Sequence, residues 1–141
     1  MERQAFEQLV ADGFEAIPER FRARVANVVF LVENEPSREV RRQEGLAEDE
    51  TLLGHYQGLP LAERGDHYGV GATLPDAIVM YQHPIEEEAA ALLKERGGNF
   101  IAAVREVVAD TVWHEVAHHF GFDENEVRDR EDRRRARGTS E

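Results

Sequence analysis

One long segment, residues 99–120, constrains the fold more than any other part of the sequence. Asn99 is a residue that commonly caps the start of a helix, and Gly121 is the first residue afterwards that readily ends one. Between them, apolar side chains recur every three or four positions, which is the spacing of one broad helix face. They are Phe100, Ala103, Val104, Val107, Val108 and Thr111. We therefore expect a central, largely buried helix.

Shorter segments before this helix predict a small sheet and further helices. Residues 25–32 (VANVVFLV), 52–57 (LLGHYQ) and 78–82 (IVMYQ) have the length and residue types of strands. Residues 2–16 have apolar side chains at helical spacing, and helix-starting residues stand at Ser37 and Pro84. We expect an α+β fold in which the small sheet packs on the long helix and a C-terminal helix follows over residues 123–135.

The length of 141 residues fits one domain, which we expect to span residues 1–141. Glycine and proline are frequent between residues 58 and 75, so this stretch predicts a surface loop. Residues 128–141 contain six Arg and four acidic residues, and we expect them to form an exposed, fraying end of the last helix. The alternative is an arm that binds nucleic acid or contacts the acidic remainder of the chain.

Charge and composition narrow the function classes. The chain has 29 Asp and Glu against 17 Lys and Arg, a formal net charge of −12. We expect no nucleic-acid partner, because phosphate contacts depend on clustered basic side chains. No apolar run approaches the ~18 residues of a membrane span, and the first residues lack a signal-peptide core, so we expect a cytoplasmic protein without membrane partners. Because cysteine is absent, any metal must be bound by His, Asp or Glu.

The long helix ends in the sequence His-Glu-Val-Ala-His, from His114 to His118. Residues four apart lie one above the other on a helix, so His114 and His118 can bind one tetrahedral zinc ion. Glu115 lies about 100° around the helix from His114, beside the open position of such a metal rather than in its ligand shell. A carboxylate there can take a proton from a water that the metal has acidified. The pattern predicts a zinc hydrolase with Glu115 as the catalytic base.

The longer segment HEVAHHFGFDE, residues 114–124, resembles the signature HExxHxxGxx(E) of the zincin metallopeptidases. The chain looks most like the small bacterial zincin-like proteins that consist of a minimal core. The resemblance implies a minimal zincin-like fold with His114 and His118 as zinc ligands, Glu115 as the general base, Gly121 at the turn and Glu124 as the third ligand.

The third ligand stays open among several acidic residues. The metzincin branch would have a histidine at Glu124 and a downstream methionine turn, but the only methionines here are Met1 and Met80. The gluzincin branch takes its third ligand from a separate helix further along the chain. The alternatives to Glu124 are therefore Asp123, Glu126 and Glu131.

Side chains outside the motif are candidates for supporting the metal or the substrate. Asp110, one turn before His114, can accept a hydrogen bond from a ligand imidazole, and we expect His119 to support or pack rather than ligate. Donors to a developing oxyanion could be Tyr81 and His83, with His67 and Tyr68. In zincins a strand above the zinc pairs with the substrate, and residues 78–82 are the expected edge strand.

The resemblance implies a zinc-dependent metallopeptidase that hydrolyses peptide bonds of a peptide or protein substrate through a metal-activated water. The alternative is a zincin-like protein that binds a metal or a peptide with little or no turnover, because a chain of this length leaves little room for a lid or second subdomain.

Overall fold

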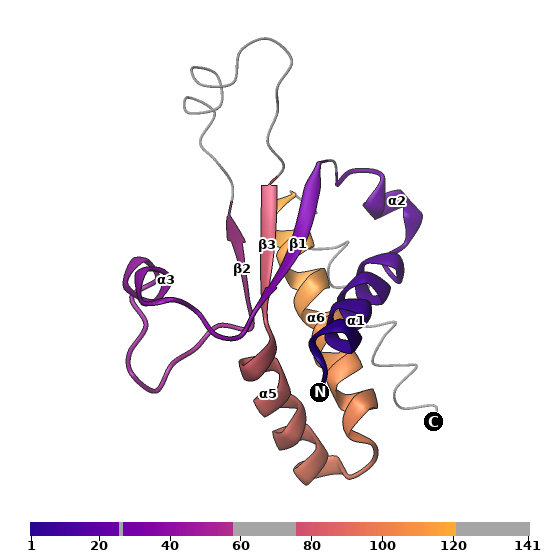
Figure 1. Cartoon of the computed structure of the whole chain (residues 1–141). Helices are drawn as coiled ribbons and strands as arrows, with labels where there is room; N and C mark the ends of the chain where they lie inside the picture. Colours follow the sequence, from indigo (N-terminus) through magenta and orange to yellow (C-terminus); the bar gives the residue numbers. More distant parts are fainter. Residues whose placement is uncertain (26, 58–75, 121–141) are drawn as a thin grey trace.

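The computed structural model describes residues 1–25, 27–57 and 76–120, and its elements form a small α+β fold (Figure 1). The predicted fold class is therefore confirmed. The predicted loop over residues 58–75, the helix over residues 123–135 and the Arg-rich end lie outside the described residues. In chain order the elements are α1 (Arg3–Glu15), α2 (Glu19–Arg22), β1 (Val28–Glu33), α3 (Arg38–Gln43), β2 (Gly54–Gln57), β3 (Asp76–Tyr81), α5 (Gln82–Arg96) and α6 (Phe100–His119).

The long helix α6 forms where capping and periodicity predict it. The side chain of Asn99 accepts a hydrogen bond from the main-chain N–H of Ala102 at 3.0 Å, which satisfies one of the donors that a helix start leaves open. Buried positions extend over a wide arc of α6 from Val104 onward, so α6 is the element against which the others pack. They are Val104, Val107, Val108, Thr111, Val112, Trp113, Val116 and Ala117.

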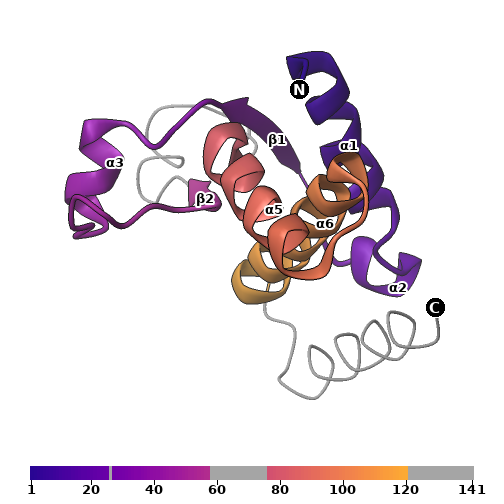
Figure 2. The same cartoon turned by 90° about the horizontal axis from the view of Figure 1, so that it is seen from below.

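Two helices flank α6, with α1 on one side and α5 on the other (Figures 1 and 2). The predicted face of α1 is buried, and Gly13 lets this helix approach α6 closely, since a Cβ there would lie 3.5 Å from Ala109 Cα. From α5, Ile85 and Ala89 enter the same core. This helix begins before Pro84, which still lies in its first turn, where a missing N–H costs no hydrogen bond.

The sheet has the strand order β1-β3-β2, with β1 parallel and β2 antiparallel to β3. Gly54 of β2 lies opposite Met80, and His55 lies opposite Val79. The expectation that residues 78–82 form the substrate-binding edge is wrong, because β3 is the central strand and its main-chain groups already bond on both sides. Within the described residues the edges are β1 and β2.

Successive side chains along each strand point to opposite faces of the sheet. Phe30, Ile78 and Met80 point into the core beneath α1 and α6. The opposite face carries Val29 and Leu31 of β1, which are 39% and 46% exposed. One side of the sheet therefore builds the core, and the other is only partly covered.

The short helix α3 lies beside this second face. The Ser37 side chain accepts a hydrogen bond from the N–H of Val40 at 3.1 Å, as its capping position predicts. Gly45 follows the helix with φ of +66°, a left-handed conformation that glycine adopts without strain. None of the helices in the described ranges has the length and apolar character that a bilayer crossing requires.

Candidate metal and active site

The His-Glu-Val-Ala-His segment occupies the last turns of α6. His114 and His118 are exposed, whereas Val116 and Ala117 between them are buried. The apolar residues thus anchor the helix in the core while the two imidazoles lie on its outer side. Both predicted zinc ligands are accessible from solution.

The ring of His114 is oriented by its own helix. Its Nδ1 lies 3.0 Å from the main-chain carbonyl oxygen of Asp110, and a carbonyl can only accept, so Nδ1 must carry the hydrogen. In the neutral ring the lone pair is then on Nε2, the nitrogen that would bind a metal. The main-chain carbonyl of Asp110 provides this contact, and the role expected for its carboxylate stays a prediction.

Glu115 projects toward β2 and is half-buried, with 21% of its side chain exposed. Burial raises the pKa of its carboxyl above the ordinary value. The charges of His55, His118 and His114 lower this pKa and that of Glu44 raises it, but burial is the largest cause. A carboxylate with a raised pKa holds a transferred proton more readily than an exposed one, which is a property of a general base.

The edge strand β2 lies directly on this turn of α6. A Cβ added to Gly54 would lie 3.0 Å from Thr111 Cγ2 and 3.5 Å from Glu115 Cγ, so the missing side chain of Gly54 is what allows the close approach. The main chain of β2 therefore passes beside the predicted catalytic base.

His119, the residue after the second histidine of the pair, contacts Glu115. Its Nε2 lies 3.3 Å from Glu115 Oε2, and its ring stacks on Tyr56 of β2 with centroids 4.1 Å apart and planes 13° apart. Burial, followed by the charges of His118 and His55, lowers the pKa of His119. The supporting role expected for His119 stays a prediction.

His55 is the site residue that the sequence analysis missed. Its Nε2 lies 3.0 Å from Glu44 Oε1, its Nδ1 is buried without a hydrogen-bond partner in the described part of the chain, and its charge opposes the effect of burial on Glu115 more than any other. It belongs to the strand predicted over residues 52–57, and nothing in that segment indicates that the strand reaches α6.

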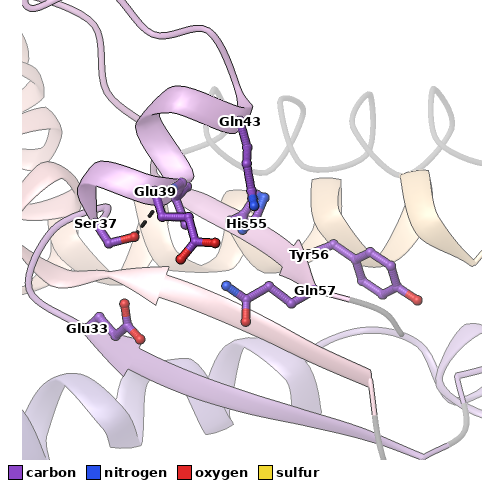
Figure 3. A pocket seen from close by; sticks show the side chains of 8 residues that line it. Glu33, Ser37, Glu39, Gln43, His55, Tyr56 and Gln57 are labelled. Carbon is purple, nitrogen blue, oxygen red and sulfur yellow. Dashed lines mark hydrogen bonds between the residues drawn. The ribbon is translucent and has the colours of Figure 1, made fainter. Parts of the chain in front are cut away.

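A polar pocket of about 490 Å³ lies between α3 and the second face of the sheet (Figure 3). Glu33 and Glu39 face it from β1 and α3, and His55 and Gln57 face it from β2. Figure 3 shows Tyr56 turned away from these residues, although it borders the pocket. Consecutive residues of β2 thus serve two surfaces, one with α3 and one with α6.

Tyr81 and His83, the other two predicted candidates, have different surroundings. Tyr81 is fully buried and its hydroxyl has no hydrogen-bond partner among the described residues, so a substrate cannot touch it in this structure. Burial, with the charges of Glu33, Glu44 and Glu115, raises the pKa of Tyr81 to about 12.

His83 does not join the site. It is exposed, and its ring contacts Glu35 at 2.9 Å and Glu87 at 3.3 Å. These two contacts hold the ring between the segment after β1 and the helix α5. Both ring nitrogens lie against carboxylates, which does not favour His83 as a donor to an oxyanion.

Within residues 1–25, 27–57 and 76–120, no three His, Asp or Glu side chains are grouped as a metal site would require. His114 and His118 supply two potential ligands on α6. The predicted third ligand, Glu124, and its alternatives Asp123, Glu126 and Glu131 lie outside the described residues, as do His67 and Tyr68.

Comparisons with known proteins give one family. A family model described as zincin-like metallopeptidase matches residues 25–134, which is more than half of the chain. Among solved structures, the chain is similar to a conserved hypothetical protein from T. thermophilus, with 24% identity and a TM-score of 0.47. That similarity covers 86% of this chain and 100% of the other. No curated protein matches the chain.

Proposed function

The chain belongs to the zincin-like metallopeptidase family, and from this premise we propose that it hydrolyses peptide bonds with a zinc ion and with Glu115 as the general base. The observation that carries the proposal is the placement of Glu115. It stands next to the exposed His114 and His118, is half-buried, and lies against an edge strand. A proton-accepting group, two metal-binding groups and a surface for an extended chain thus occur together.

The donor set on α6 fits a zinc ion. Two exposed imidazoles one turn apart match the ligand type and spacing that zinc takes, and the contact with the Asp110 carbonyl leaves Nε2 of His114 as the binding atom. We propose Glu124 as the third ligand. When bound, zinc would supply Lewis acidity, lowering the pKa of a water toward ~7 and polarising the scissile carbonyl.

Glu115 would carry out the proton transfers. Its carboxylate accepts a proton from the attacking water while the water oxygen bonds to the carbonyl carbon, and the same proton later passes to the amine nitrogen as the peptide bond breaks. The raised pKa of Glu115 suits both steps, because the carboxyl must hold the proton between them.

We propose β2 as the strand along which an extended peptide binds. It is an edge strand within the described residues, and Gly54 brings its main chain against Glu115. Main-chain hydrogen bonds to an edge strand hold a peptide in extended form largely independently of its sequence.

The first test of this function is metal content. Protein purified without chelator should contain about one zinc ion per chain, the number expected of a single catalytic site. His114→Ala and His118→Ala should each lose it, while His83→Ala, an exposed histidine away from α6, should keep it. A wild-type protein that binds no zinc would overturn the proposal.

The second test is turnover. Glu115→Gln should keep its zinc and lose hydrolysis of a broad peptide library, since the amide cannot accept the proton. Zinc binding without any Glu115-dependent hydrolysis would instead support the alternative of a metal- or peptide-binding protein without turnover.

A further inference from the structure

Glu115 contacts a side chain that the proposed reaction does not use. His119 is one turn further along α6, and its Nε2 lies 3.3 Å from Glu115 Oε2. The contact is attractive when Nε2 carries a hydrogen, because a lone pair there would repel this oxygen. His119 contacts Oε2, which is one of the two carboxylate oxygens of Glu115.

The imidazole of His119 is in turn held by β2. The Tyr56 ring lies nearly parallel to it, 13° between planes and 4.1 Å between centroids, and Phe120 meets Tyr56 edge-on with centroids 6.2 Å apart. His118 meets the same imidazole edge-on, 4.7 Å between centroids. The plane of the His119 ring is therefore set by flat neighbours, of which Tyr56 covers its face.

We propose that Tyr56 is a positioning residue for the general base: by stacking on His119 it directs Nε2 at Oε2 of Glu115, so that Oε1 faces the attacking water. The inference rests on the proposed function, because that function makes Glu115 the base. It adds a residue of the edge strand, 59 positions earlier in the sequence, to the machinery that orients the base.

The physical reason is the freedom of a glutamate side chain. Three rotatable bonds separate its carboxylate from the main chain, and burial alone does not choose among their combinations. A contact at one oxygen keeps the other in place, and a displacement of about 1 Å in a reacting group can cost on the order of 100-fold in rate. Tyr56 lies in β2 and Glu115 lies in α6. The orientation of the base therefore depends on β2 being packed against α6.

Steady-state kinetics on the zinc-loaded protein tests the proposal. Tyr56→Leu keeps apolar bulk but loses the flat ring, and we expect kcat to fall about 10-fold with little change in KM, since orientation is lost rather than binding. Tyr56→Phe keeps the ring and should retain wild-type kcat. His83→Ala serves as the histidine control and should also be unchanged. Wild-type kcat in Tyr56→Leu, or an equal loss in Tyr56→Phe, would overturn the proposal.

A double-mutant cycle tests whether Tyr56 acts through His119. His119→Ala should lower kcat by a similar factor, and Tyr56→Leu combined with His119→Ala should be no slower than His119→Ala alone, because both changes break one chain of contacts. Losses that multiply would show that the two side chains act independently and would refute the positioning role.

An NMR measurement on the zinc-free chain reports the orientation of the Glu115 side chain and does not depend on enzyme activity. Side-chain scalar couplings of Glu115 should report one dominant rotamer in the wild type and in Tyr56→Phe, and averaged rotamers in Tyr56→Leu. Identical couplings in all three would contradict the inference even if the enzyme is active. Absence of hydrolysis in the wild type would contradict the proposed function, while the couplings would still decide whether Tyr56 orients Glu115.

Discussion

Replacing Gly54 with alanine tests how β2 is seated on α6. The new methyl carbon would lie 3.0 Å from Thr111 Cγ2, 3.4 Å from the carbonyl oxygen of Val79 and 3.5 Å from Glu115 Cγ. The first of these distances is too short for two carbon atoms, whose optimum is about 3.5–4.0 Å. Because Thr111 is buried and its hydroxyl donates to the Val107 carbonyl at 2.8 Å, its side chain cannot simply turn away.

The expected magnitude combines two opposing terms. Overpacking by one methyl typically costs about 1–3 kcal/mol. Alanine also reduces the freedom of the unfolded chain, which offsets about 0.4–1 kcal/mol. We therefore expect Gly54→Ala to lower the free energy of unfolding by about 1–2 kcal/mol.

Denaturant unfolding of four proteins measures this effect. Thr111→Ser removes Cγ2 and keeps the hydroxyl, so alone it should cost about 1 kcal/mol for the lost buried methyl. In the double variant the new methyl occupies the vacated space. Its loss of unfolding free energy should therefore be smaller than the sum of the two single losses by about 1–2 kcal/mol. Gly13→Ala is the control, because its Cβ would meet nothing closer than 3.5 Å.

Two results would refute this reasoning. If Gly54→Ala were as stable as the wild type, β2 would not be seated on Thr111 as tightly as the distance indicates. If the losses from Gly54→Ala and Thr111→Ser were additive, the two side chains would not share the contact.

Three further outcomes follow from other described residues. Tyr81→Phe should raise the free energy of unfolding by about 1–2 kcal/mol, because the buried hydroxyl lacks a partner in the described part of the chain. Its folded pKa of about 12 exceeds the ordinary 10.0, so the wild type should lose roughly 1.9 kcal/mol relative to Tyr81→Phe as pH rises from 10 to 12, measured by urea unfolding. Zinc-free Glu115→Gln should be more stable than the wild type at neutral pH, since a raised folded pKa favours the protonated form, and thermal scans should show the difference vanishing below about pH 4. Asn99→Ala should cost about 1 kcal/mol and Asn99→Ser much less, as calorimetry would show.

Local signals in the sequence predicted the elements whose cause is local. The caps at Asn99 and Ser37 and the spacing of apolar residues in α1 depend only on neighbouring residues, and the structure confirms them. The order of the strands depends on long-range packing, which the pattern of a single strand does not encode. For that reason the pattern of residues 78–82 predicts a strand but not its place, and the edge position implied by the resemblance to zincins is wrong because β3 lies in the centre.

The residues of the candidate site likewise divide into those that local sequence predicts and those that depend on long-range packing. His114, Glu115 and His118 could be named because one helical turn relates them, and their roles stay a prediction. The contribution of β2 could not be foreseen, because Tyr56 stacks on His119, and His55 comes near enough to lower the pKa of Glu115, only after the strand has docked on α6. Residues 114–120 alone contain no trace of that contact.

The edge position of β2 also bears on how the protein opens. β2 has four residues and one strand neighbour within the described residues, and the fully buried side chains of the core come from other elements, with Tyr56 of β2 packed against them. A short edge element can detach at a lower free energy than global unfolding. Amide hydrogens of β2 should therefore exchange with deuterium earlier than those of β3, and each such opening would uncover Glu115 while the rest of the protein stays folded.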